Sequence, residues 1–159
     1  MDTEAPPVVL ALMMALELRF AELYMAASRS SESVDMKEFW ARMSRQEESH
    51  AGYIDRIRKI YINAPEKFKI GSRFNPVILK SWLSEIGSAA SKVKSGEIGP
   101  AELLSIASEY ENTLMEKNYG EYLISDDAEY LALIGKITSD TAVHGKILRD
   151  KITETGSGA

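Results

Sequence analysis

Residues 36–57 read MKEFWARMSRQEESHAGYIDRI, and this stretch determines the predicted fold. Its apolar residues recur every three or four positions, which places them on one face of an α-helix. Glu47 and His50 lie at the centre of that face, whereas Glu48 points away from it. A carboxylate in an apolar core is very costly unless it is paired or bound to a metal, so this helix needs an explanation for its buried polar residues.

Three further segments show the same helical spacing, and no segment shows sustained β alternation. The predicted helices of the bundle cover residues 7–28, 35–61, 99–122 and 125–154. The connections after the first and the third helix are short, so each flanking pair should form an antiparallel hairpin. We therefore expect an all-α four-helix bundle of two antiparallel hairpins joined by a long crossover.

The chain is expected to form one domain over residues 1–159. Its predicted parts are the hairpin 7–61, the crossover 62–98, the hairpin 99–154 and a disordered tail, 155–159. The crossover should carry an extra helix over residues 77–94, anchored to the bundle by Trp82. Asp35 followed by Glu38 resembles a capping box at the start of the second helix. Residues 65–75 have no predicted structure.

The composition excludes several kinds of chemistry. With no cysteine, the 159 residues cannot form a disulfide scaffold, a thiolate metal site or a Cys-ligated iron centre. A net charge of -5 argues against binding nucleic acid. The longest apolar run, Val8–Leu16, is too short to span a membrane, and the residues before it are too acidic for a secretory signal. We therefore expect a soluble cytoplasmic protein.

Both histidines of the chain and three glutamates fall on apolar helix faces. These residues are Glu17, Glu47, His50, Glu111 and His144. Taken singly, a histidine on such a face is usually a hydrogen-bonded core residue, and a glutamate is often paired with Lys or Arg. Here all five would need such explanations at once, which favours a shared site.

An internal repeat supports the shared site. Shifting the first hairpin by 94 positions lays Glu17 on Glu111 and His50 on His144. The same shift lays Glu47 on Thr141, so the repeat breaks at one ligand position. Two sets of a glutamate plus a Glu-x-x-His motif would suit a pair of metal ions, because carboxylates can bridge cations and imidazole binds iron, zinc and copper.

With these residues, the chain resembles the rubrerythrin and ferritin-like family over both hairpins. The matching features are Glu17 with Tyr24 one heptad later, the E-E-S-H stretch ending at His50, Glu111, and His144. The resemblance implies a ferritin-like bundle, a carboxylate-bridged di-iron site, and redox chemistry with peroxide or dioxygen, or iron oxidation and storage. Manganese and zinc are alternative metals, and a homodimer or larger homo-oligomer is expected.

The chain departs from the family pattern in two ways. Thr141 stands where the second Glu-x-x-His motif has its glutamate, which leaves open whether one or two ions bind. The neighbouring Asp140 is a further candidate ligand, but one residue is about 100° round the helix, so it would need a bent helix or a reoriented side chain. Without cysteines there is no rubredoxin iron to relay electrons, so turnover would need an external electron donor.

Three functions follow from these expectations. The leading one is a di-iron oxidoreductase of the peroxidase or ferroxidase type. The second is iron storage, which requires a hollow oligomer. The third is a bundle that has lost its metal and serves as a binding or structural module, for which Thr141 is the strongest argument.

Overall fold

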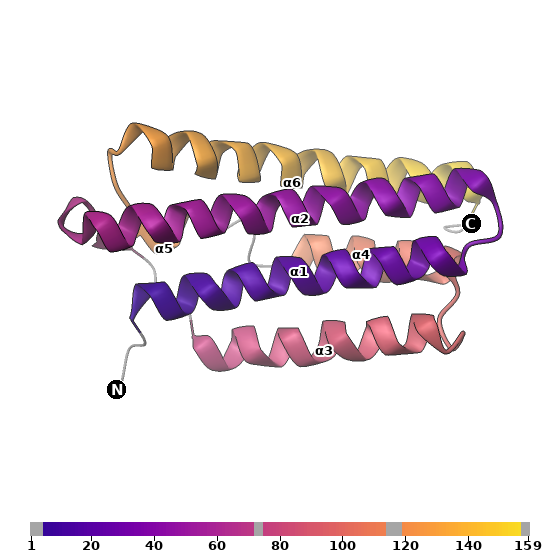
Figure 1. Cartoon of the computed structure of the whole chain (residues 1–159). Coiled ribbons are helices and arrows are strands. Elements are labelled where there is room, and N and C mark those ends of the chain that lie inside the picture. Colours follow the sequence, from indigo (N-terminus) through magenta and orange to yellow (C-terminus); the bar gives the residue numbers. More distant parts are fainter. Residues whose placement is uncertain (1–4, 72–74, 114–118, 157–159) are drawn as a thin grey trace.

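The computed structural model describes residues 5–71, 75–113 and 119–156. Helices dominate these residues, as Figure 1 shows, so the predicted all-α bundle is confirmed. In chain order the elements are α1 (Pro6–Ser30), α2 (Val34–Asn63), the 3-10 turn η1 (Pro65–Lys67), β1 (Lys69–Ile70), α3 (Pro76–Lys94), α4 (Pro100–Thr113), α5 (Tyr119–Tyr122), β2 (Leu123–Ile124) and α6 (Ala128–Thr155).

The start of α2 differs from the prediction. Its N-cap is Ser33, whose hydroxyl accepts the Met36 N–H at 3.2 Å, so Asp35 lies inside the first turn and does not begin a capping box. A serine hydroxyl satisfies a free N–H of the first turn, which is why the helix begins at Val34, directly after Ser33. The predicted extra helix of the crossover is present as α3, one residue longer at its start.

The second hairpin departs further from the predicted helix bounds. The predicted helix over residues 99–122 is described as α4, which ends at Thr113, and the separate short helix α5; residues 114–118 lie outside the described part of the chain. Helix α6 begins at Ala128 instead of Ser125, because the Asp127 carboxylate caps it by accepting the Tyr130 N–H at 2.9 Å. The helix reaches Thr155, and residues 157–159 of the predicted tail lie outside the described residues.

A small antiparallel strand pair, which the sequence did not predict, ties the crossover to the second hairpin. Lys69 pairs with Ile124 and Ile70 with Leu123. Two-residue strands are too short to show alternation in a sequence. Next to the pair, a Cβ on Gly71 would lie 2.2 Å from the Glu121 carbonyl oxygen, so only glycine fits there.

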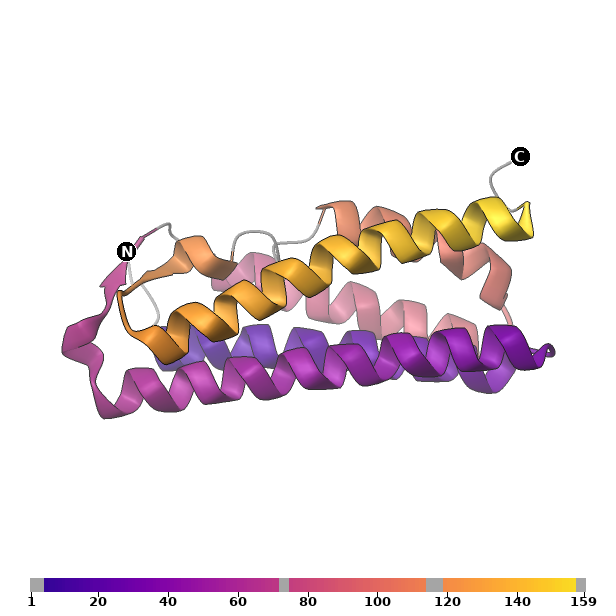
Figure 2. The same cartoon turned by 90° about the horizontal axis from the view of Figure 1, so that it is seen from above.

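The long helices pack side by side and bury the predicted apolar faces. Figures 1 and 2 show α1, α2 and α6 running along the length of the molecule, with α3 packed on α1 and α4 next to α6. Buried core residues of the first hairpin include Leu10, Met13, Phe20, Tyr24, Phe39, Trp40, Met43, Ile54 and Ile57. No helix within the described ranges is both long enough and apolar enough to cross a bilayer.

Candidate metal centre

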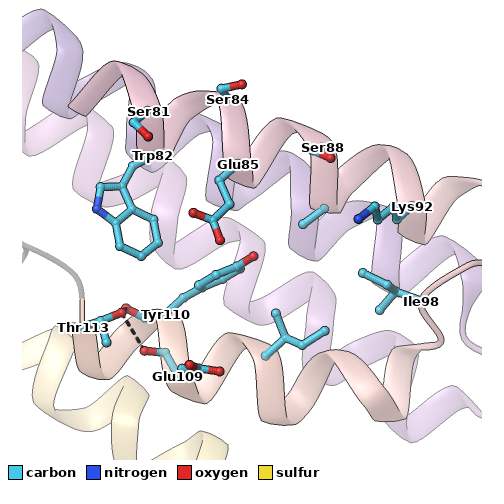
Figure 3. Close-up of a pocket in the computed structure, with 12 residues that line it drawn as sticks. Ser81, Trp82, Ser84, Glu85, Ser88, Lys92, Ile98, Glu109, Tyr110 and Thr113 are labelled. Carbon is cyan, nitrogen blue, oxygen red and sulfur yellow. Dashed lines mark hydrogen bonds between the residues drawn. The ribbon is translucent and has the colours of Figure 1, made fainter. Parts of the chain in front are cut away.

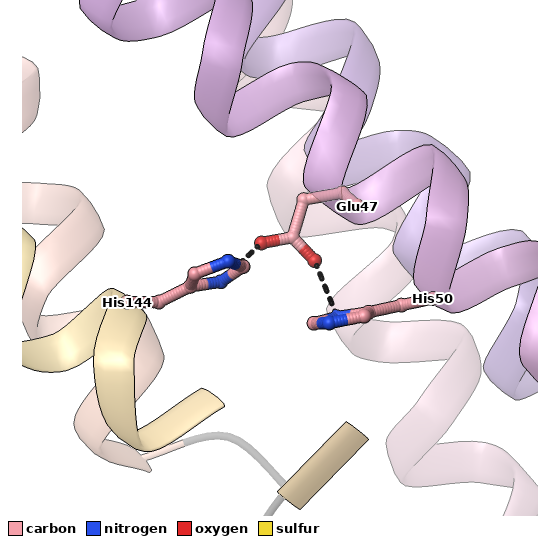
Figure 4. A group of neighbouring side chains, drawn as sticks. All are labelled: Glu47, His50 and His144. Atoms are coloured by element: carbon pink, nitrogen blue, oxygen red, sulfur yellow. Dashed lines mark ion pairs between the residues drawn. The ribbon is translucent and has the colours of Figure 1, made fainter. Parts of the chain in front are cut away.

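One carboxylate lies between two imidazoles in the middle of the bundle. Figure 4 shows Glu47 and His50 on α2 and His144 reaching toward them from α6. The Nδ1 atom of His50 lies 3.3 Å from Glu47 Oε2, and the Nδ1 atom of His144 lies 3.1 Å from Glu47 Oε1. Each oxygen of Glu47 therefore faces a different histidine.

The backbone explains why these three side chains meet. Residues 47 and 50 are separated by three positions on a continuous α-helix, so their side chains leave the same face. Helix α6 packs along that face of α2 and presents His144 to it, with the His50 and His144 rings stacked at a centroid distance of 5.2 Å and an angle of 24°. All three side chains are fully buried.

The electrostatics favour an ionised Glu47. Burial opposes the charge and would raise the pKa of Glu47, but hydrogen bonding with His144 and His50 outweighs this and holds the pKa well below its usual range. A metal ligand must be deprotonated, so Glu47 is in the state that binding requires.

These three residues can hold a metal ion, since one ligand atom from each lies within 4.8 Å of the others. The fit is supported by a buried atom of His144: its Nε2 has no hydrogen-bond partner among the described residues. Buried ring nitrogens are normally hydrogen-bonded or bound to a metal, so an unpartnered ring nitrogen makes His144 unusual for a purely structural core histidine.

The two other predicted glutamates are also buried, and each accepts a tyrosine hydroxyl from the other half of the chain. Tyr119 donates to Glu17 Oε1 at 2.8 Å, and Tyr24 donates to Glu111 Oε1 at 3.0 Å. The other oxygen of Glu17 lies 3.6 Å from His50 Nδ1, which places Glu17 at the edge of the cluster.

Glu111 is also buried, at 3% exposure. Like Glu17, it does not belong to the group of three residues whose ligand atoms all lie within 4.8 Å of one another. The structure therefore brings Glu47, His50 and His144 together, adds Glu17 next to His50, and leaves Glu111 linked to Tyr24.

Thr141 and Asp140 behave differently from each other. The buried Thr141 hydroxyl donates to the Ile137 carbonyl of its own helix at 2.9 Å. Asp140 Oδ2 lies 3.3 Å from His50 Nε2, while its other oxygen accepts from Lys136 at 2.8 Å. Because α6 is a continuous α-helix from Ala128 to Thr155, Asp140 approaches His50 through the direction of its side chain, and no helix bend is needed.

Sequence reasoning missed Tyr119 as part of this site. The repeat contained a signal: the shift of 94 positions lays Tyr24 on Asn118, immediately before Tyr119. The match is displaced by one residue, and α5 is a separate short helix, so an ungapped comparison could not find it.

Comparisons with known proteins add no identification: the sequence matches no family model and no curated protein, and no solved structure matches the chain.

Proposed function

We propose that this chain is a rubrerythrin-like, ferritin-like metal protein that binds iron and reduces peroxide or dioxygen with electrons from an external donor. The observation that carries the proposal is the buried Glu47 carboxylate between His50 and His144, each approaching a different oxygen. If the cluster were only a hydrogen-bond network, the buried Nε2 atom of His144 would be left without a hydrogen-bond partner among the described residues.

Each residue of the proposed site has a different role in holding the metal. His50, His144 and Glu47 would hold the metal, since each oxygen of Glu47 already faces one of the two rings. Glu17 would add a carboxylate next to His50, and Glu111, held by Tyr24, is a further candidate ligand. When bound, iron supplies the exchange of electrons with peroxide or dioxygen.

The tyrosines position the carboxylates. Tyr119 holds Glu17 Oε1, which leaves Glu17 Oε2 directed at His50. Tyr24 holds Glu111 Oε1 in the same way from the first hairpin. Hydrogen bonds to ligating carboxylates fix their orientation and tune the affinity of the site.

Iron is proposed over manganese and zinc from the family resemblance, because carboxylate and imidazole ligands by themselves accept all three metals. The test is to purify the protein without chelators, load it anaerobically with Fe(II), and measure metal content and anomalous diffraction at the iron edge. We expect about one or two iron ions per chain. Less than about 0.2 iron per chain would overturn the proposal.

Turnover is tested separately on the loaded protein. Peroxide or dioxygen consumption that requires both iron and an added one-electron reductant supports the oxidoreductase function. Iron bound without such consumption would instead support storage, and light scattering would then show whether a hollow oligomer exists.

The third function, a metal-depleted module, is favoured by one observation: the Thr141 hydroxyl donates to its own helix and offers no charge to the site.

We expect Thr141→Glu to supply the missing carboxylate ligand and to bind a second ion about tenfold more tightly or better, because residue 141 lies one turn before His144. Titration with Fe(II) measures this, and Thr141→Gln is the control of equal size without charge. If both variants bind iron alike, Thr141 does not lie at a ligand position.

A further inference from the structure

A second, separate cleft lies between α3 and α4. It has a volume of about 850 Å³, which is in the range of ligand pockets, and it opens to solvent. The two helices are supported from different sides, since α3 packs on α1 and α4 on α6, and this leaves the space between them open. Figure 3 shows side chains of both helices directed into it.

Two aromatic rings form one end of the cleft. Trp82 of α3 and Tyr110 of α4 meet edge to face, with ring centroids 5.8 Å apart and planes at 89°. Tyr110 also contacts the buried Phe20 ring at 6.2 Å, which fixes it from behind. Both rings are only partly buried, so they offer aromatic surface to a ligand.

Two carboxylates flank these rings from opposite walls. Glu85 comes from α3 and Glu109 from α4, and both side chains are exposed. Neither forms an ion pair with a residue in the described ranges, although lysines and arginines elsewhere on the surface pair with acids. Burial raises the pKa of Tyr110, and the charges of Glu85 and Glu109 raise it further, so both carboxylates act on the ring between them.

We propose that this cleft binds an organic cation, an alkylated ammonium or a guanidinium group, between Trp82, Tyr110, Glu85 and Glu109. An aromatic face attracts a cation through its quadrupole, and a nearby carboxylate adds direct charge attraction. The only cationic side chain that lines the described cleft, Lys92, lies toward its other end, near Ile98. A net charge of -5 also draws cations toward the molecule.

The ligand can be a free amine or a basic side chain of another protein, and both present the same chemistry. This inference is independent of the proposed iron chemistry, because it uses no residue of the metal centre.

The test follows the indole N–H signals of the whole protein by NMR during titrations. One probe is choline, and its neutral counterpart of the same shape is 3,3-dimethylbutanol; N-acetyl-arginine amide represents a basic side chain. Trp82 lies in the cleft and Trp40 is fully buried, so Trp40 is an internal control. We expect a saturable shift of the Trp82 signal with either cation, and tighter binding of the arginine probe would identify a protein side chain as the ligand.

The variants show whether the carboxylates hold the cation. We expect the double substitution Glu85→Gln and Glu109→Gln to weaken cation binding about tenfold. Glu102→Gln, at an exposed position of α4 outside the cleft, should leave it unchanged. No Trp82 shift with either cation, an equal shift with the neutral alcohol, or an equal loss in Glu102→Gln would overturn the proposal.

Discussion

Iron affinity should fall by about 100-fold or more when Glu47 is replaced by glutamine, which keeps the size of the side chain and removes its charge. Glu47 is the residue that both histidines approach, at 3.3 Å from His50 and 3.1 Å from His144. The held-down pKa of Glu47 means that the substitution removes a full negative charge from the centre of the site. Competition with a chromogenic Fe(II) chelator under anaerobic conditions measures the change.

Glu48→Gln is the matched control. Glu48 is the next residue of α2 and is exposed, so it carries the same charge on the outer face of the helix. It should bind iron as the unaltered protein does. Equal losses in the two variants would mean that net charge, and not the position of Glu47, controls binding; unchanged binding in Glu47→Gln would remove Glu47 from the ligands.

Trp40→Ala should lower the free energy of unfolding by about 3–5 kcal/mol, the range for deleting a fully buried large aromatic side chain. Trp40 is 0% exposed, stacks on Tyr24 at 5.3 Å, and contacts Phe39 edge to face at 5.1 Å. Because Tyr24 donates to Glu111, the cavity would also loosen one carboxylate of the candidate centre. Urea denaturation of the metal-free protein measures the loss of stability.

Trp82→Ala provides the comparison within the same chain. Trp82 is only partly buried at the mouth of the cleft between α3 and α4, so its removal leaves no closed cavity. We expect a loss well below that of Trp40→Ala, since the cost of truncation depends on how completely the site is enclosed. Similar losses would mean that Trp82 carries core packing which its exposure does not reveal.

The buried faces of the helices were predictable because apolar residues recur every three or four positions in the sequence, which is the period of an α-helix. The spacing separates Glu47 from Glu48, and the structure buries the first and exposes the second. The repeat likewise laid Glu17 on Glu111, and the structure buries both. Periodicity gives a direction for each side chain but no distance between helices, so it could not show that Glu17 lies 3.6 Å from His50 or that Tyr24 donates to Glu111.

Contacts that depend on local geometry were not predictable. The hydroxyl of Ser33 determines where α2 starts, and a strand pair of two residues per strand leaves no pattern. Asp140 reaches His50 because a short side chain at the edge of a helix face can turn toward the interior, which a face assignment by residue angle does not describe. The repeat did not reveal Tyr119, because the shift of 94 positions lays Tyr24 on the residue before it.

The position of the histidines along the chain has a mechanical consequence. His50 and His144 are 94 residues apart, one on each hairpin, and Glu47 touches both. An ion held by this group would act as a cross-link that closes a loop of that length and removes conformations from the unfolded chain. In the chain-entropy account of disulfides, closing a loop of about 100 residues is worth about 4.7 kcal/mol. A reversibly bound ion would thus link the two hairpins, and the free energy of unfolding would rise with the concentration of free metal.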